Sequence, residues 1–354
     1  MVRVRVSEYL EVMSSTDTPP NRPHAGAVGV GIIGLGFMGR THLAAYAANS
    51  RASVRALCDP AAAATASGGN LINPGSEGVA QMLATLPREH TVAALLARAD
   101  VELVSICTPT DSHVDLVRAA IAAGKHVLVE KPVALDAKEI RALDREAKAA
   151  GVLVMPAHCM RFWPAWAWMA QAVQTKRYGR PLRASFRRLG ARPTWSQEFY
   201  LDITRSGGAI IDLHIHDADF VRFAFGEPAT VTARGDRMHV HARYSYADGL
   251  EIEAEGGWMD DPKFAFMMVA TIECERGIID FRIGRDPELC VLEEGVERPI
   301  ATGIDYPLGA GYEHEIDALL QSVLESSTEA PVTLREAAAT QELLDREIAL
   351  LQSG

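Results

Sequence analysis

Hydrophobic and polar positions follow two different patterns along the first half of the chain, one typical of strands and one typical of helices. Short apolar runs rich in β-branched residues cover 28–33, 101–107, 125–129 and 152–155, and helix-like stretches with one apolar face cover 37–48, 113–123 and 136–150. Gly124 and Gly151 stand where the last two helical stretches should end. Strands that alternate with helices in this way are typical of βαβ units. The pattern therefore predicts a doubly wound parallel α/β sheet that is complete near Met155.

The second half has the period of two that strands show. The runs are 230–233, 240–246, 250–254, 267–274 and 277–281, separated by glycines and Asp-Pro turns. They predict a predominantly antiparallel, open-faced sheet, and helical stretches at 311–324 and 334–352 close the chain. Because an apolar free face invites self-association, we expect a homodimer or homotetramer.

With 354 residues the chain exceeds the size at which one core usually stops growing, so two domains are expected. We predict a mobile tail at 1–26, a dinucleotide-binding domain at 27–155 and a substrate-binding and oligomerisation α/β domain at 156–354. The C-terminal helices are candidates for packing back on the first domain. Between 61 and 100 the periodicity is broken, and we expect irregular structure followed by a helix near 91–98.

The composition of the chain disfavours some classes of binding partner. The formal net charge of -11 disfavours a phosphate-neutralising surface, so no nucleic acid is expected. No apolar run approaches the roughly 18 residues that span a membrane. The five cysteines form no CxxC pair, and the first 26 residues lack the apolar core of a secretion signal. These features favour reduced thiols, a cytoplasmic location and small-molecule partners.

The glycines after the first apolar run carry the first chemical signal. Gly34, Gly36 and Gly39 form GxGxxG between a predicted strand and a predicted helix, with Phe37 and Met38 inside the motif. In this context the first glycine lets the chain turn, the second admits a pyrophosphate and the third allows close helix packing. The helix N-terminus then faces the anion. The stretch predicts a dinucleotide site.

Asp59 ends the next apolar run, about 20 residues after the motif. A carboxylate there accepts hydrogen bonds from the ribose hydroxyls and repels a 2′-phosphate, which favours NAD over NADP. The alternative reading is a simple Asp-Pro turn. Arg40 and Arg55 are able to help hold a phosphate, so NADP stays open as the less favoured cofactor.

Glu130, Lys131 and Pro132 follow the apolar run 125–129. A lysine at the carboxyl end of a buried parallel strand points into the crevice where such sheets bind ligands, and the proline ends the strand. We therefore predict that Lys131 is a catalytic ammonium beside a nicotinamide ring. The predicted cofactor contacts at this edge also include Thr108, Pro109, His113 and Glu130.

The strongest signal of the second half is the segment 206–219, which contains Asp212, His214, His216 and Asp219. If it is helical from about residue 209, Asp212, His216 and Asp219 share one face, which suits proton transfer. Two alternatives stay open. One is a capped helix whose polar groups satisfy buried backbone. The other is a zinc site, which is weaker because His214 and His216 diverge on a helix and no cysteine accompanies them, so we expect no metal.

An aromatic stretch, HCMRFWPAWAWM, begins at His158. Its aromatic faces can stack on a sugar ring, and we predict substrate contacts from Arg161 and Trp163. The alternatives are an interdomain core helix for the tryptophans and a salt bridge or a cofactor-phosphate contact for Arg161.

Together, GLGFMG, CTPTDSH, AGKHVLVEKPVAL, RFWPAW and GGAIIDLHIHDAD resemble the glucose-fructose oxidoreductase/inositol dehydrogenase family. The resemblance implies a Rossmann domain followed by an oligomerising α/β domain with an open sheet. It also places the family's catalytic lysine on Lys131, its substrate-binding aspartate on Asp212 and its catalytic histidine on His216. The sequence departs from the family in the long stretch 61–100 and in His214, which replaces a common glycine.

These features predict an oxidoreductase that transfers a hydride between a sugar, cyclitol or polyol carbinol and the nicotinamide of NAD. In this hypothesis His216 takes the hydroxyl proton, Lys131 stabilises the substrate oxygen, and Asp212 orients the substrate or the base. An NAD-dependent glycosidase and a non-catalytic NAD-binding sugar sensor stay open as alternatives.

Overall fold

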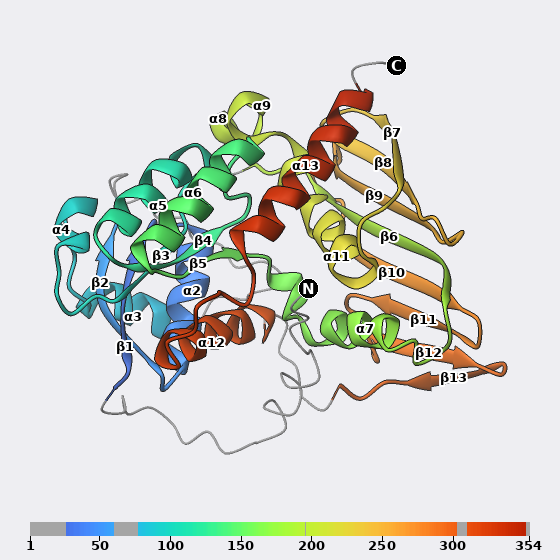
Figure 1. Ribbon diagram of the computed structural model, residues 1–354, viewed down its shortest axis with the longest axis horizontal. Coiled ribbons are helices and arrows are strands. Elements are labelled where there is room, and N and C mark those ends of the chain that lie inside the picture. Colours follow the sequence, from blue (N-terminus) through green and yellow to red (C-terminus); the bar gives the residue numbers. More distant parts are fainter. Residues whose placement is uncertain (1–25, 60–76, 195, 303–309, 352–354) are drawn as a thin grey trace. The chain divides into compact units, whose positions relative to one another are not determined.

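A computed structural model describes residues 26–59, 77–194, 196–302 and 310–351 (Figure 1). The tail predicted at 1–26 lies outside the described residues except for Gly26, and so does the part of the predicted irregular stretch at 61–76. The described chain divides into two compact units, which we call unit 1 (26–163 and 310–338) and unit 2 (164–302 and 339–351). The domain boundary predicted at residue 155 stays a prediction. Among the described residues, no helix is both long and apolar enough to cross a membrane.

Unit 1 contains a parallel sheet in the order β2-β1-β3-β4-β5. Its strands are β1 (Val28–Ile33), β2 (Ala52–Cys58), β3 (Leu103–Ile106), β4 (His126–Glu130) and β5 (Val154–Ala157). All of β1 and β3 is buried, as expected of strands covered on both faces. The strand order reverses between β1 and β3, which is the point where open α/β sheets bind ligands.

The helices of unit 1 match the predicted pattern with one exception. They are α2 (Phe37–Ala48), α3 (Glu77–Thr85), α4 (Val92–Leu96), η1 (Thr110–Ser112), α5 (His113–Ala122), α6 (Ala137–Ala150), η2 (Cys159–Arg161) and α12 (Ala310–Leu324). The Asp136 side chain caps α6, and left-handed Gly151 ends it. The prediction of irregular structure before residue 91 was wrong for α3, whose two turns are too short for a clear period.

Helix α12 belongs to unit 1 although it comes late in the sequence. It contacts α2, η2, β1 and β4. Asn49 Nδ2 donates to Asp317 Oδ1 at 2.7 Å, and Arg51 forms an ion pair with the same carboxylate. One C-terminal helix therefore packs on the dinucleotide-type sheet.

Unit 2 contains an eight-stranded sheet in the order β13-β12-β11-β10-β6-β9-β8-β7. The strands are β6 (Pro181–Ala191), β7 (Thr230–Gly235), β8 (His239–Ser245), β9 (Glu251–Met259), β10 (Met267–Cys274), β11 (Gly277–Arg282), β12 (Leu289–Glu293) and β13 (Val296–Pro299). Only the β6–β9 pair is parallel among these described strands, which confirms the predominantly antiparallel sheet. Strands β6, β12 and β13 were not predicted. In β6 the inward Arg188 interrupts the apolar alternation.

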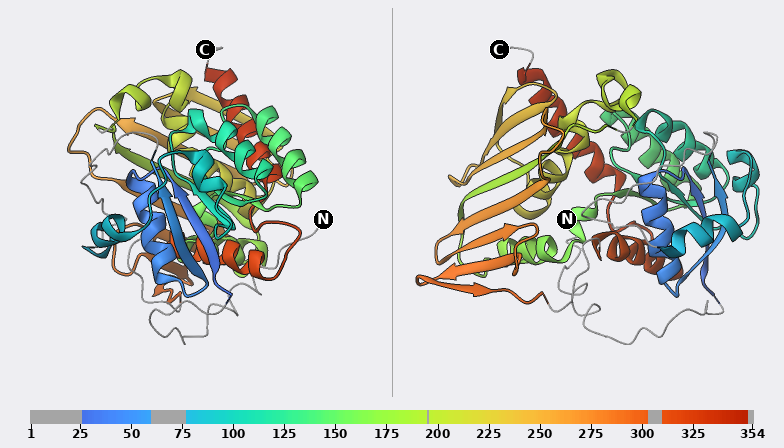
Figure 2. Two further views of the ribbon diagram at one scale, coloured as in Figure 1. Left: turned by 90° about the vertical axis from the view of Figure 1, so that its left-hand side faces the viewer. Right: turned by 180° about the vertical axis from the view of Figure 1, so that it is seen from behind.

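The helices of unit 2 include α7 (Pro164–Gln174), α8 (Gln197–Tyr200), α9 (Ile203–Ser206), α10 (Ala209–Asp212) and α11 (Ile215–Phe225). Helix α10 contacts β8 and β9 and helix α11 contacts β9 on one face of this sheet, and α7 packs against α11 (Figure 2). Helix α13 (Leu334–Leu351) begins in unit 1 and continues into unit 2. The core under α7 is aromatic, because Trp166 contacts Phe186, Phe220 and Phe281. The core interpretation of the aromatic stretch thus holds for Trp166.

The opposite face of the sheet in unit 2 is polar along β8 and β9. On β8 and β9 the outward positions carry His239, His241, Arg243, Glu253 and Glu255. Ion pairs such as Arg243–Glu253 connect neighbouring strands. Toward β10, β11 and β12 the same face carries the apolar residues Val269, Ile278 and Leu292, so it combines a polar and an apolar part.

Candidate active site

The turn between β1 and α2 has the geometry of a dinucleotide-binding turn. Gly34 adopts φ +89, and its N–H donates to the Cys58 carbonyl at 2.8 Å. A Cβ on Gly39 would lie 1.9 Å from the Gly34 carbonyl oxygen, whereas a Cβ on Gly36 would meet nothing within 4 Å. The third glycine thus allows the close approach of helix and strand, and the space beside Gly36 is open at the N-terminus of α2. Phe37 and Met38 form the first turn of that helix.

Asp59 lies directly after β2, at the same edge of the sheet. Its Oδ2 accepts the N–H of Leu35 at 3.0 Å, so the carboxylate is fixed to the glycine turn. A carboxylate in this position is suited to the ribose hydroxyls of a dinucleotide bound at the turn.

The Thr108–His113 segment continues from β3. Thr108 Oγ1 lies 2.7 Å from Ser112 Oγ. The buried His113 ring lies 2.8 Å from the carbonyl oxygens of both Pro132 and Thr108, and burial lowers the pKa of His113. This ring connects the turn after β3, including Pro109, to the segment that carries Lys131.

Lys131 follows β4 at the carboxyl edge of the sheet and is half-buried. The register aligns Ile33 with Ile106 and Ile106 with Val129, so the glycine turn, the Thr108 turn and Lys131 all lie at one edge. The Lys131 N–H donates to Glu130 Oε2 at 3.2 Å. The structure therefore brings together, within unit 1, the predicted cofactor-side residues.

A polar cluster that the sequence analysis missed lies behind Glu130. His42 Nε2 lies 3.1 Å from Glu130 Oε1, and His42 Nδ1 lies 2.7 Å from Ser105 Oγ and 3.4 Å from Cys107 Sγ. Burial alone would raise the pKa of Glu130, but His42, Lys131 and nearby groups hold it below its ordinary value. Burial would likewise lower the pKa of His42, yet Cys107 and Glu130 raise it well above the usual range.

The signal for His42 was present in the sequence as a histidine three residues after Gly39, on the buried side of α2. The role of a buried histidine depends on the partner that faces its ring, and the sequence does not show which residue that is.

In unit 2 the segment 209–219 is not one continuous helix, which was the condition for the shared face considered from the sequence. Helix α10 ends at Asp212, and α11 begins at Ile215. The His214 N–H donates to the Ala209 carbonyl, five residues back, which interrupts the regular pattern. Asp212 and His216 are half-buried and lie on separate short helices, so the spacing argument for one shared face does not apply.

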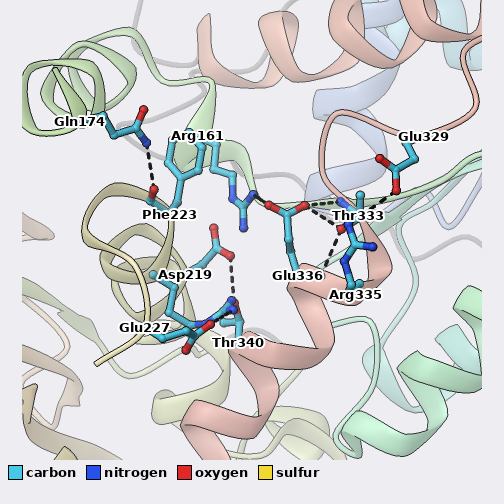
Figure 3. A network of polar contacts seen from close by, with 11 residues as sticks. Arg161, Gln174, Asp219, Phe223, Glu227, Glu329, Thr333, Arg335, Glu336 and Thr340 are labelled. Carbon is cyan, nitrogen blue, oxygen red and sulfur yellow. Dashed lines mark hydrogen bonds and ion pairs between the residues drawn. The ribbon is translucent and has the colours of Figure 1, made fainter. Parts of the chain in front are cut away.

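The side chains of His214 and Asp219 form polar contacts within unit 2. His214 Nε2 lies 3.0 Å from Glu347 Oε2 and 3.1 Å from Tyr244 Oη. Asp219 Oδ1 accepts the hydroxyl of Thr340 at 3.0 Å (Figure 3). His214 is thus directed to a carboxylate of α13. In the described part of the chain, the potential metal ligands that gather do not include His214 or His216.

Arg161 and Trp163 are largely buried in unit 1. Arg161 Nη1 donates to Glu336 Oε1 at 2.7 Å, and Glu336 also forms a capping box with Thr333 at the start of α13 (Figure 3). The Trp163 ring packs edge-on against Tyr312. The salt bridge considered for Arg161 is present, and the substrate contacts assigned to both residues stay predictions.

Comparison with known families agrees with this arrangement. Residues 28–158 match the profile described as "Oxidoreductase family, NAD-binding Rossmann fold", and residues 166–278 match the "GFO/IDH/MocA C-terminal domain". The first match covers the parallel sheet of unit 1, and the second covers strands β6 to β10 of unit 2 and the start of β11.

Curated relatives share part of the sequence. The inositol 2-dehydrogenase of Rhizobium meliloti (strain 1021) is 34% identical over 206 residues, which is 57% of this chain and 57% of that protein. The D-apiose dehydrogenase of Paraburkholderia graminis is 30% identical over 236 residues, 66% of this chain and 58% of that protein. The matched part spans less than two thirds of the length of these relatives.

Solved structures share the fold. Levoglucosan dehydrogenase in complex with NADH and levoglucosan has a TM-score of 0.78 at 20% identity, covering 92% of this chain and 98% of the other. UDP-N-acetylglucosamine 3-dehydrogenase from Acidithiobacillus ferrooxidans has a TM-score of 0.73 at 24% identity, again covering 92% and 98%.

Proposed function

Because the chain belongs to the GFO/IDH/MocA oxidoreductase family, we propose that it is an NAD-dependent dehydrogenase acting on a sugar, cyclitol or related polyol. The observation that carries this proposal is the position of Lys131, at the strand edge that also holds the glycine turn and Asp59. An ammonium there can stabilise negative charge on a substrate oxygen beside a nicotinamide. The relatives named as inositol and D-apiose dehydrogenases support the substrate class.

The residues of unit 1 fit a dinucleotide. The open space beside Gly36 admits a pyrophosphate, and the 12-residue helix α2 begins beside it, so its N-terminus suits an anion. Asp59 favours NAD over NADP because its charge opposes a 2′-phosphate. When bound, NAD would supply the hydride acceptor.

We assign one role to each catalytic residue. Lys131 donates a hydrogen bond to the substrate oxygen and stabilises its developing negative charge. His216 accepts the hydroxyl proton, and Asp212 orients the substrate or the imidazole. Lys131 lies in unit 1, whereas His216 and Asp212 lie in unit 2. Arg161 and Trp163 complete the proposed substrate contacts.

The proposal is tested by incubating the protein with NAD or NADP and a panel of sugars and polyols while NADH absorbance is recorded. A dehydrogenase accumulates reduced cofactor with at least one substrate. An NAD-dependent glycosidase would release sugar without net reduction, and a sensor would bind NAD and the sugar without turnover. No reduction across the panel by a protein that binds NAD would contradict the proposal.

The proposal also includes the domain bounds, the location and the oligomeric state of the protein. We place the dinucleotide domain at 27–155 and the substrate domain at 156–354, and we expect a cytoplasmic homodimer or homotetramer. Multi-angle light scattering of the purified chain measures the oligomer size directly. A monomer at micromolar concentration would contradict the expected assembly.

A further inference from the structure

Two histidines and a glutamate meet on the outer face of the eight-stranded sheet. His239 and His241 are two residues apart on β8, so both side chains project from the same face. On the neighbouring antiparallel strand β9, Glu255 pairs with His241, and Gly257 pairs with His239. Three possible metal ligands are therefore placed side by side by strand register alone. This face is opposite to the one that α10 and α11 cover.

The ligand atoms have the spacing of a metal site. His239 Nε2 lies 2.9 Å from Glu255 Oε1, and His241 Nε2 lies 3.7 Å from the same oxygen. The two rings are stacked with centroids 5.0 Å apart, and one donor atom from each of the three residues lies within 4.8 Å of the others. In tetrahedral zinc with bonds of about 2.0–2.1 Å, ligand atoms are about 3.3 Å apart. The two nitrogen-to-oxygen distances lie on either side of that value.

The surroundings hold the three groups in suitable orientations. A Cβ at position 257 would lie 2.8 Å from the His239 ring, so glycine there makes room for the imidazole. Arg187 Nε donates to Glu255 Oε2 at 2.6 Å, which fixes the carboxylate while Oε1 faces the imidazoles. This arrangement resembles the outer hydrogen bonds that orient metal ligands in known sites.

We propose that His239, His241 and Glu255 form a Zn²⁺-binding site on the outer face of the unit 2 sheet. Two imidazoles and a carboxylate are a known ligand set for zinc, and they leave a fourth position for water. The competing interpretation is a purely structural ion pair in which Glu255 joins His239 and Arg187 without metal.

The test uses the tag-free full chain, stripped with a chelator and titrated with ZnCl₂ by calorimetry. We expect one bound equivalent with a dissociation constant in the micromolar range or below. His241→Ala and Glu255→Gln should each weaken binding at least tenfold. The matched control is His90→Ala, because His90 is an exposed histidine outside the cluster, and it should bind as the wild type does.

Circular dichroism shows that each variant is folded, and Co²⁺ gives a second readout. Co²⁺ should produce the visible absorption of a tetrahedral site in the wild type and in His90→Ala, and this absorption should be lost in His241→Ala. The proposal is overturned if the wild type binds no Zn²⁺. It is equally overturned if folded His241→Ala and Glu255→Gln bind Zn²⁺ as tightly as the wild type.

Discussion

The Nε2 atom of His42 lies 3.1 Å from Oε1 of Glu130, and both residues are buried in unit 1. The other carboxylate oxygen, Oε2, accepts the backbone N–H of Lys131. Glu130 thus connects a histidine of α2 to the backbone of the proposed catalytic lysine. A buried carboxylate is retained in its charged form only when such partners compensate its desolvation.

Replacing His42 by alanine should remove this compensation. Loss of one partner from a buried ion pair typically costs about 3–5 kcal/mol, so we expect the free energy of unfolding to fall by about 3 kcal/mol. Urea denaturation followed by fluorescence measures the change. The control is the exposed His90→Ala, which should change stability by no more than about 0.5 kcal/mol. Wild-type stability in folded His42→Ala would show that the pair is energetically unimportant.

Alanine substitutions at two glycines of the motif should affect the stability of the fold and the affinity for the cofactor to different degrees. Gly39→Ala would place a Cβ 1.9 Å from the Gly34 carbonyl oxygen, so we expect a loss of about 3 kcal/mol or more. Gly36→Ala enters open space and should cost at most about 1 kcal/mol. The same methyl group would occupy the pyrophosphate position and weaken NAD binding at least tenfold, or about 1.4 kcal/mol.

Thermal unfolding and NAD titration of both glycine variants check this separation. If Gly36→Ala bound NAD as tightly as the wild type, the pyrophosphate would not lie at this turn.

Asp59→Asn removes the charge of the carboxylate but keeps its hydrogen bond, because the amide oxygen can still accept the N–H of Leu35. We expect the ratio of kcat/KM for NAD over kcat/KM for NADP to fall about tenfold, since the repulsion of the 2′-phosphate is removed. Steady-state kinetics with both cofactors measure the ratio. An unchanged ratio would place cofactor discrimination on other residues.

The sheet of unit 1 was predictable because its signals are local. Apolar runs marked the strands, Gly124 and Gly151 marked helix ends, and the glycine motif marked the turn after β1. Each of these depends on residues close together in the chain, so the periodicity and the turn chemistry agree.

The features that were missed depend on residues far apart in sequence. His42 and Glu130 are separated by 88 positions, and His214 and Glu347 by 133. Helical spacing did not reveal the break at His214, where the backbone N–H bonds to the carbonyl five residues back and the ring meets Glu347 of α13. Strand β6 was missed because Arg188, which faces inward, is compensated by Asp217, a partner that no local pattern reveals.

Lys131→Met should reduce kcat at least about 100-fold with the substrate identified by the panel assay, since it removes a donor to the developing oxyanion. NAD affinity should change less than about threefold, because the turn at Gly34 is untouched. Lys138→Met is the matched control, as Lys138 is exposed on α6 and should retain full activity. Full activity in folded, NAD-binding Lys131→Met would remove the lysine from the mechanism.

The buried His214 predicts a pH dependence of stability in unit 2. Burial would lower its pKa, but Glu347 and Asp217 raise it above the ordinary 6.5 against the opposing charge of Arg188. Tyr244 Oη also lies 3.1 Å from His214 Nε2. A histidine whose pKa is higher in the folded state stabilises the fold fully below the unfolded value, and this stabilisation is lost as pH rises through the folded pKa.

His214→Asn cannot bind this proton, so the difference in unfolding temperature between wild type and variant should be largest near about pH 6. It should shrink as pH rises toward about pH 9, because the wild-type imidazolium then loses its proton and the charged pair with Glu347 disappears. Calorimetry across this range measures the difference, and His90→Asn provides an exposed control whose difference should stay near zero. A difference that grows with pH would mean that His214 is neutral in the folded protein and that Glu347 holds it only by a neutral hydrogen bond.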